Sequence, residues 1–425
     1  MHRLHYDLVM RDQVRGIAKC CPNILACETW IRHNQLSFAH SFAEVFNHQL
    51  NGYARATNDR LAEHDGWIDF DSFRHKRYFI LLAVHKITAH HYNHPSPPQA
   101  KIPALNKQGQ NLARYAWLVL GINVAVVLWG AYVRASGSGA GCGDHWPLCN
   151  GQVLPQAPQV ATVIELAHRG SSGIALIMVL VLAAGAWRKF ARGHRVRAAA
   201  MLSVASILVE SLLGAVIVLA NFTGSNTSGM RALVVALHLV NTLFLLGALA
   251  LTAGWAGGGG AWRWKDHPAS AALFVGGAIG FALLASSGAI TALGDTLFPS
   301  ASLAQGLQQD LSLTVNLLVR LRVLHPLFAV FMGTFAVSMA LLLYRRARNP
   351  LTQRLAWLHT ALFGLQCVLG MLNLVLLAPV PLQILHLLLA DCVWVVYVLL
   401  ASCALAQPAQ AFRARAAEGS NPVRA

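Results

Sequence analysis

Residues 160–187 read VATVIELAHRGSSGIALIMVLVLAAGAW, an apolar run that contains a glutamate, a histidine and an arginine. The run is longer than the about 20 residues that cross a bilayer as a helix. A charged side chain near the centre of a membrane costs about 2.5–3.5 kcal/mol even on permissive insertion scales. Glu165 and His168 are three positions apart, so a helix places both on one face, where they can meet a common partner. The run therefore predicts a membrane helix with a functional site.

The composition extends this prediction to most of the chain. The 425 residues are 56% hydrophobic and 12% charged, whereas a soluble domain has about 25% charged residues. Eight apolar runs are long enough to span a bilayer, at about 115–135, 160–187, 198–220, 231–254, 269–293, 313–344, 355–377 and 382–406. Because backbone groups in lipid need internal partners, each run is expected to be a helix. We predict an all-α polytopic membrane protein with eight transmembrane helices.

The net charge of +16 could indicate nucleic-acid binding, but the basic residues are concentrated in alternate loops and in the tail. They are Arg188, Lys189, Arg192, Arg195, Arg197, Arg263, Lys265, Arg345, Arg346, Arg348, Arg354, Arg413, Arg415 and Arg424. An excess of basic residues marks the cytoplasmic loops of a membrane protein. The sequence thus predicts a multi-pass protein of the cell inner membrane, with both termini in the cytoplasm. We expect membrane lipid to surround the protein, and we expect no nucleic-acid partner.

The first 105 or so residues differ from the rest of the chain. They are polar, hold eleven of the nineteen histidines, and lack the apolar core of a signal peptide. Cys20, Cys21, Cys27 and His33 lie close together, but their spacing matches no standard zinc pattern. We predict that residues 1–110 form a poorly ordered cytoplasmic extension, or follow an upstream start that the cell does not use.

The eight runs form two similar units. WGAYVRASGSG (129–139) ends the first run and SGAITALGD (287–295) ends the fifth, and aligning Gly130 with Gly288 gives an offset of 158. His168 then matches His325 at an offset of 157, Gly214 matches Gly370 at 156, and His238 matches His386 at 148. Parallel repeats about an axis along the membrane normal are a known architecture. We predict two pseudo-symmetric four-helix bundles, at 111–260 and 261–408, and a cytoplasmic tail at 409–425.

Each unit has one histidine in its second helix and one in its fourth. A single histidine within a membrane is more often a packing or hydrogen-bonding residue, but four in duplicated positions need another explanation. Histidines on facing helices of a bundle can hold a haem iron from both sides. A proton relay or a non-haem metal site would not explain one pair in each half. We predict that His168 and His238 are axial ligands of one haem iron, and that His325 and His386 are axial ligands of another.

Two arginines are expected at the same level of the membrane as these histidines. Arg322 precedes His325 by one helical turn, and Arg134 ends the first helix. A guanidinium group can bind the carboxylates of a haem in a bidentate manner. The alternative is that both arginines anchor their helices at the membrane interface. We predict that Arg134 contacts the first haem and that Arg322 contacts the second.

The loop GSGAGCGDHWPLCNGQVLPQ (137–156) contains two cysteines, which are the only cysteines in the loops expected outside the cytoplasm. Disulfides form in such oxidising compartments. A metal site that includes His145 is the alternative. We predict a disulfide between Cys142 and Cys149.

Four segments together resemble the heme A synthase family. They are GAYVRASGSGAGCGDHWPLCNGQVLP (130–155), ELAHR (165–169), GAITALGDTLFPS (288–300) and RLRVLHP (320–326), and the resemblance covers about residues 112–408. It implies two four-helix halves, with haem O bound as substrate in the first and a permanent haem b cofactor in the second. The implied reaction oxidises a methyl group of haem O to the formyl group of haem A, for cytochrome c oxidase. Heme O synthase and cytochrome c oxidase assembly factors are then expected partners.

The resemblance also implies roles for individual residues. His168 and His238 would flank the substrate haem, His325 and His386 would ligate haem b, and Glu165 would be the essential carboxylate. The position three before His325 is an arginine, so the second half has no counterpart of Glu165. This asymmetry favours chemistry in the first half and electron transfer in the second.

The chain departs from the family at one position and leaves other functions to be weighed. Glu210 stands where relatives often have a glutamine, whereas Gln366 keeps that residue in the second half, and the sequence assigns Glu210 no role. A di-haem electron carrier would share the four histidines but gives no reason for Glu165. A transporter with histidine relays would predict paired Gly/Pro interruptions near the midplane, and the sequence shows none.

Overall fold

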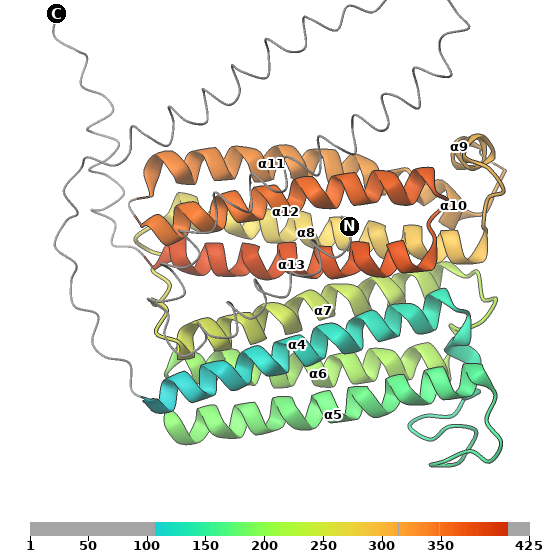
Figure 1. Ribbon diagram of the computed structural model, residues 1–425, viewed down its shortest axis with the longest axis horizontal. Helices are drawn as coiled ribbons and strands as arrows, with labels where there is room; N and C mark the ends of the chain where they lie inside the picture. Colours follow the sequence, from blue (N-terminus) through green and yellow to red (C-terminus); the bar gives the residue numbers. More distant parts are fainter. Residues whose placement is uncertain (1–106, 313, 348, 407–425) are drawn as a thin grey trace, which may run out of the picture. The chain divides into compact units, whose positions relative to one another are not determined.

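The computed structural model describes residues 107–312, 314–347 and 349–406, and its long elements are all helices (Figure 1). The predictions for the N-terminal extension before residue 107, including its cysteine and histidine cluster, and for the tail at 409–425 lie outside the described residues. Within the described part, eight helical segments are long and apolar enough to cross a membrane. The predicted all-α fold with eight spans is confirmed.

The first four spans form one group of helices. They are α4 (Lys107–Ala135), α5 (Val160–Lys189), α6 (Arg195–Leu219) and α7 (Gly229–Ala256). Helices α4 and α6 each pack against both α5 and α7, which makes a four-helix bundle. Just after α4, Gly137 has a φ of +70°, a left-handed conformation that glycine adopts without steric cost. Helix α7 begins at the Ser228 cap, whose Oγ accepts a hydrogen bond from the Arg231 N–H at 3.3 Å.

The second group follows the same order of packing. It contains α8 (Pro268–Leu297), α9 (Leu303–Leu311), α10 (Leu317–Leu321), α11 (Leu324–Arg346), α12 (Pro350–Val375) and α13 (Val380–Leu405). Helix α8 packs against α11, α11 against α12, and α12 against α13, which returns to α8. Three of these helices have a proline in the first turn, where its missing N–H would have no intrahelical partner in any case.

The apolar run at 313–344 predicted one continuous helix for the sixth span, but the structure shows two. The span is divided into α10 and α11, with a break at Arg322 and Val323. Pro326 explains the break, because a proline has no N–H to donate and its ring crowds the carbonyl four residues earlier, at Arg322. Since α11 begins at Leu324, His325 lies in its first turn and not deep within a long helix.

Helices α7 and α13 join the two groups. Helices α7 and α13 are the most buried of the eight spans. In their most apolar segments, 50% of α7 and 44% of α13 are buried, whereas 22–28% of the corresponding segments is buried in the other six spans. The Trp394 indole Nε1 on α13 donates to the Leu243 carbonyl on α7 at 2.7 Å, and the Trp255 Nε1 donates to Ser402 Oγ at 3.1 Å. The two groups therefore share one core, and the division at residue 260 stays a prediction.

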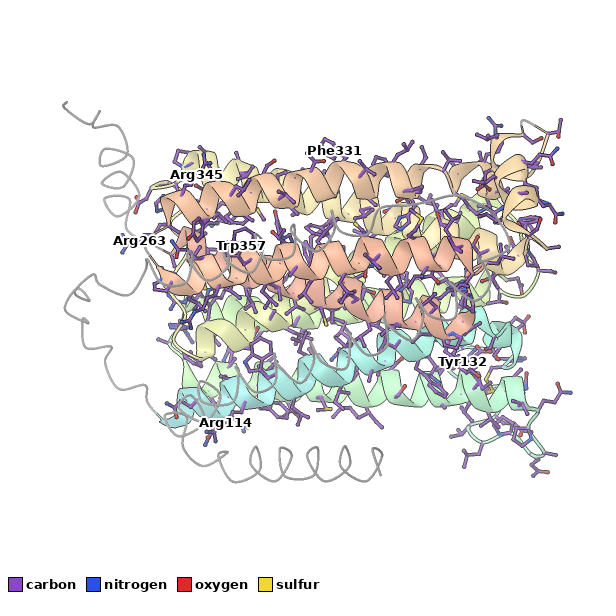
Figure 2. The ribbon with its side chains drawn as sticks, turned by 45° about the horizontal axis from the view of Figure 1, so that its top comes forward. Arg114, Tyr132, Arg263, Phe331, Arg345 and Trp357 are labelled. Carbon is purple, nitrogen blue, oxygen red and sulfur yellow. A yellow bond between two sulfur atoms is a disulfide. The ribbon has the colours of Figure 1, made fainter. Side chains whose placement is uncertain are left out.

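The outward side chains are those expected of a membrane protein. Phe331 is 67% exposed and Trp357 is 48% exposed on the outside of the bundle (Figure 2). Large apolar side chains in such positions are stable when lipid surrounds them. The labelled Arg263 and Arg345 lie at one end of the helices, and Tyr132 lies toward the other. We call the latter the loop end, because the Cys142–Cys149 loop follows α4 there (Figure 1). The chain is a multi-pass membrane protein.

Candidate functional site

His325 and His386 lie close together near the loop end of the second group. Their ring centres are 6.3 Å apart and their planes are inclined by 80°. Two metal–imidazole bonds of about 2 Å, with roughly 1 Å from each nitrogen to its ring centre, would place the centres roughly 6 Å apart. The pair therefore has the separation that a single iron requires of two axial imidazoles.

Polar neighbours orient these two rings. The Ser287 Oγ lies 3.2 Å from Nδ1 of His325, and a hydrogen bond on this nitrogen leaves Nε2 for a metal. The amide nitrogen of Gln366 lies 3.1 Å from Nε2 of His386. Ligation of a metal through that nitrogen requires the amide to give way. The other nitrogen of His386, Nδ1, is buried without a hydrogen-bond partner among the described residues.

Glycines allow the rings to approach the neighbouring helices closely. A Cβ atom added to Gly288 would lie 2.9 Å from Cε1 of His325, and one added to Gly370 would lie 3.1 Å from Cε1 of His386. In the first group, a Cβ on Gly130 would lie 2.8 Å from Cε1 of His168. The sequence repeat aligned Gly130 with Gly288, whereas it aligned Gly370 with Gly214, which has no described atom within 4 Å of its would-be Cβ. The contacts support the repeat, and pseudo-symmetry of the two groups stays a prediction.

The first group holds the second pair of histidines. His168 lies on α5, and its Nδ1 is buried without a hydrogen-bond partner among the described residues. His238 lies on α7, and its Nδ1 is 3.3 Å from a carboxylate oxygen of Glu210 on α6. Buried polar atoms are nearly always hydrogen-bonded in folded proteins. The unpaired nitrogen of His168 is therefore consistent with a missing ligand.

The donor set of the second group fits a haem, and a haem in the first group stays a prediction. Each half contributes one pair of imidazoles, and a porphyrin supplies the other four ligands of a haem iron itself. Over residues 107–406, as far as they are described, no cluster of three or more His, Cys, Asp or Glu side chains is positioned to hold a bare metal ion. The described residues thus give no support to the alternative of a non-haem centre.

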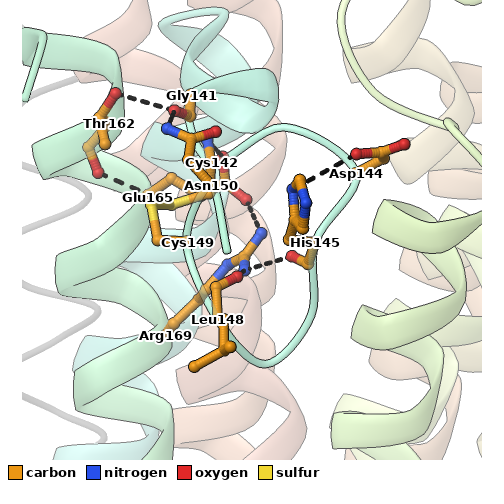
Figure 3. Close-up of a disulfide and its surroundings, with 10 residues drawn as sticks. All are labelled: Gly141, Cys142, Asp144, His145, Leu148, Cys149, Asn150, Thr162, Glu165 and Arg169. Atoms are coloured by element: carbon orange, nitrogen blue, oxygen red, sulfur yellow. Dashed lines mark hydrogen bonds and ion pairs between the residues drawn. A yellow bond between two sulfur atoms is a disulfide. The ribbon is translucent and has the colours of Figure 1, made fainter. Parts of the chain in front are cut away.

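Glu165 is directed into the loop that follows α4 (Figure 3). Its side chain is almost fully buried, and its Oε2 accepts a hydrogen bond from the Cys142 N–H at 2.8 Å. Its Oε1 pairs with the Arg169 guanidinium at 2.5 Å, one turn further along α5. Arg169 in turn donates to the carbonyls of His145 at 2.7 Å and Leu148 at 2.6 Å. The sequence placed Glu165 on the same helix face as His168, and the structure shows its carboxylate bound to the loop.

The loop itself is closed by the predicted disulfide between Cys142 and Cys149. The Thr162 hydroxyl donates to the Gly141 carbonyl at 2.8 Å and ties the loop to α5 (Figure 3). The backbone at Gly141 lies so close to Ala161 that no Cβ would fit between them. Since the disulfide uses both cysteines, the alternative of a metal site with His145 is not favoured. The loop is therefore fixed over the start of α5.

Arg134 connects the two groups of helices. Its Nη1 donates to the Ala292 carbonyl and to Thr296 Oγ1 on α8, each at 2.6 Å, and its Nη2 donates to Gln383 Oε1 on α13 at 3.1 Å. All three acceptors belong to the second group. The predicted contact between Arg134 and the first haem has no test in these residues and stays a prediction.

Arg322 lies in an ion-pair network at the break between α10 and α11. Its guanidinium lies 2.9 Å from Asp295 on α8 and 3.0 Å from Asp310 on α9. Burial raises the pKa of the Asp310 carboxyl, and the charge of Arg322 opposes this shift. The Nη2 of Arg322 is buried without a hydrogen-bond partner in the described part of the chain. This nitrogen remains available for the haem carboxylate contact that the sequence predicted.

Sequence comparison now decides the family. Residues 113–398 match the profile of the family described as Cytochrome oxidase assembly protein. The chain belongs to this family. The matched segment includes all four predicted ligand histidines, Glu165 and the disulfide loop, and the resemblance to the heme A synthase family is confirmed.

The relatives described here have two different names, Protoheme IX farnesyltransferase and Heme A synthase. Two Thermus thermophilus strains have proteins named Protoheme IX farnesyltransferase, which are 49% identical over 324 residues. That match covers 76% of this chain and 52% of the Thermus proteins, so the chain spans about half of their length. The heme A synthase of Staphylococcus haemolyticus is 44% identical over 26% of this chain and 36% of its own. That of Halalkalibacterium halodurans is 38% identical over 30% and 41%.

Sequence reasoning did not find every residue of the site. It missed Asp295 and Asp310, because the partners of Arg322 come from two other helices. It noted Glu210 without a role, although Glu210 lies beside His238. A search for unpaired acidic residues within the apolar runs would have found Glu210 and the buried Asp391.

Proposed function

We propose that this protein is a heme A synthase, an oxidoreductase that converts a methyl group of haem O to the formyl group of haem A for cytochrome c oxidase. The observation that carries the proposal is the presence of two imidazole pairs in a member of this family, of which one has the spacing for a single iron. The first group of helices would bind haem O as substrate, and the second would bind haem b.

The four histidines would hold the two haems, and a bound haem iron supplies the electron transfer that the oxidation requires. His168 and His238 would hold haem O with its methyl group at a fixed place in the first group. His325 and His386 would hold haem b, and the free Nη2 of Arg322 would bind one of its carboxylates.

Glu165 and its loop supply what the chain itself adds to the reaction. Conversion of a methyl to a formyl group takes up an oxygen atom and releases electrons and protons. A small oxygen donor and an electron acceptor from outside the chain would serve the first two needs, and a carboxylate can accept the protons. Glu165 is a buried carboxylate one turn from His168, and it is paired with Arg169. The disulfide loop that it anchors would shield the first site from water.

The farnesyltransferase name of the Thermus relatives is not proposed for this chain. Only 52% of each Thermus protein is matched, so the activity in its name is not transferred to this chain. The name is nonetheless consistent with a neighbouring step, because a farnesyltransferase that acts on protoheme would supply a substituted haem. Heme O synthase and cytochrome c oxidase assembly factors are therefore the partners we propose.

The location that we propose follows from the distribution of charge. The exposed arginines Arg263 and Arg345 lie at the end opposite the disulfide loop (Figure 2), and basic residues mark the cytoplasmic side. A disulfide at the other end fits an oxidising compartment. We place the protein in the cell inner membrane with both termini in the cytoplasm.

A di-haem electron carrier is the second candidate, since it would use the same imidazole pairs. It gives no reason for the buried Glu165 in one half alone. Extraction and chromatography of the haems from the purified protein decide between the two. Haem b together with haem O or haem A supports the synthase, whereas haem b alone favours the carrier. His325→Ala and His386→Ala should each remove haem b.

A further inference from the structure

Glu210 lies within the first group of helices and has no part in the oxidation proposed above. Its side chain is 19% exposed and comes from α6, which faces α7. One carboxylate oxygen, Oε1, lies 3.3 Å from Nδ1 of His238. A carboxylate in a membrane helix is costly enough that it usually has a function and a partner.

Two further side chains hold this carboxylate in place. The Thr242 hydroxyl donates to Oε1 at 2.6 Å, and the Asn241 amide donates to Oε2 at 2.5 Å. Asn241 also donates to the Ser206 carbonyl at 2.9 Å, which fixes the amide itself. His238, Asn241 and Thr242 lie on one face of α7 because they are separated by three and four positions.

The second group of helices provides a comparison within the same chain. There the residue at the place of Glu210 is Gln366, which contacts His386. The residues three and four positions after His386 are Leu389 and Ala390, which cannot donate side-chain hydrogen bonds. The carboxylate and both of its donors are thus present in the first group, and all three are replaced in the second. This joint difference indicates that the three residues act together.

The glycine contacts show a matching difference. His168, His325 and His386 each lie against a glycine of the neighbouring helix, at Gly130, Gly288 and Gly370. The corresponding Gly214 has no described atom within 4 Å of its would-be Cβ, so it does not support the ring of His238. The neighbour of the His238 ring is instead the Glu210 carboxylate, which lies 3.3 Å from Nδ1 without the angle of a hydrogen bond.

We propose that Glu210 is a positioning residue that orients His238 through Nδ1 and makes its imidazole a stronger electron donor to a haem iron. A carboxylate on the second nitrogen of a ligand histidine fixes the ring and raises its basicity. A more basic ligand stabilises the oxidised iron. The haem of the first group therefore has a lower midpoint potential than it would have with a glutamine at position 210, the residue type that Gln366 provides in the second group. This proposal rests on the proposed function only in that a haem binds to His238.

The test is a reductive titration of the purified protein, followed by visible absorption. Glu210→Gln should raise the midpoint potential of one haem and leave the other unchanged, with the haem content retained. His238→Ala identifies the component that belongs to the first group, because it removes one axial ligand there. Unchanged potentials for both haems in Glu210→Gln would overturn the proposal, and so would the loss of both haems together.

A second variant guards against a failure to fold. The triple variant Glu210→Gln, Asn241→Leu and Thr242→Ala installs the three residue types that the second group already accommodates. The midpoint potential of the first-group haem should rise as it does in Glu210→Gln. An unchanged potential would again contradict the proposal. If the wild type yields neither haem O nor haem A, the proposed function fails. The titration of whichever haem binds through His238 would still test Glu210.

Discussion

Arg134 donates a hydrogen bond to the Ala292 carbonyl at 2.6 Å, and the two residues are 158 positions apart in the chain. The same offset aligns Gly130 with Gly288. Residues in equivalent positions of the two halves are thus in contact, where α4 meets α8. In an arrangement with two-fold symmetry, an element meets its own equivalent only near the axis. The axis that the repeat predicts would therefore run beside α4 and α8.

Replacement of Arg134 tests whether this contact holds the halves together. Arg134→Gln removes the hydrogen bonds to Ala292, Thr296 and Gln383 or weakens them, and should lower the free energy of unfolding by about 1–3 kcal/mol. Thermal unfolding in detergent measures the change. Arg114→Gln is the matched control, because Arg114 is exposed on the same helix. Loss of haem with unchanged stability would instead assign Arg134 to the haem, as the sequence alone suggested.

The glycine beside His168 should tolerate no side chain. Gly130→Ala would place a Cβ 2.8 Å from the imidazole, so the ring must move and the first-group haem should be lost or weakly bound. Gly121→Ala on the same helix is the control, since its Cβ would meet no described atom within 4 Å. Haem content per protein is the measurement. Equal haem content in the two variants would contradict the assigned position of His168.

The disulfide should be found intact and should contribute modestly to stability. Mass spectrometry without reductant should show Cys142 linked to Cys149, while the free thiols of Cys367, Cys392 and Cys403 remain open to alkylation after unfolding. The bridge closes a short loop, so its loss should cost about 2–3 kcal/mol. The Cys142→Ser and Cys149→Ser double variant should insert into the membrane but lose activity. Free alkylation of both cysteines in the native membrane would show the predicted topology to be wrong.

Glu165→Gln separates the chemical role of this residue from its contact with the loop. Glutamine keeps the shape and can accept the hydrogen bond from the Cys142 N–H, but it neither carries charge nor accepts a proton at neutral pH. The variant should insert, bind both haems, and fail to make haem A or stop at a partly oxidised product. Extraction of the haems measures this outcome.

Arg169→Gln serves as the matched variant for the loop. It removes the bonds to the His145 and Leu148 carbonyls but leaves the carboxylate of Glu165 in place. If Glu165 acts only by anchoring the loop, both variants should lose activity to the same degree. Normal production of haem A by Glu165→Gln would exclude the carboxylate from the reaction.

The sequence predicted the parts of the structure that depend on local composition. The eight spans, the disulfide of Cys142 and Cys149, and the place of the four histidines in the helices follow from hydropathy, cysteine count and the repeat. The break before His325 was missed, although Pro326 was visible, because the apolar run continues through it. The partners of Glu165, Arg134 and Glu210 could not be predicted, because each contact joins segments whose packing no local pattern specifies.

The burial of α7 against α13 has a consequence for biosynthesis. Among the described spans, α7 is the fourth in chain order and α13 is the eighth, so the face of α7 that contains Leu243 initially meets lipid. Its neighbour Trp394 is synthesised only after three more spans. A nascent chain that stops after α12 would therefore present an incomplete helix surface to membrane chaperones and proteases. The buried face of α7 is thus complete only after α13 has been inserted.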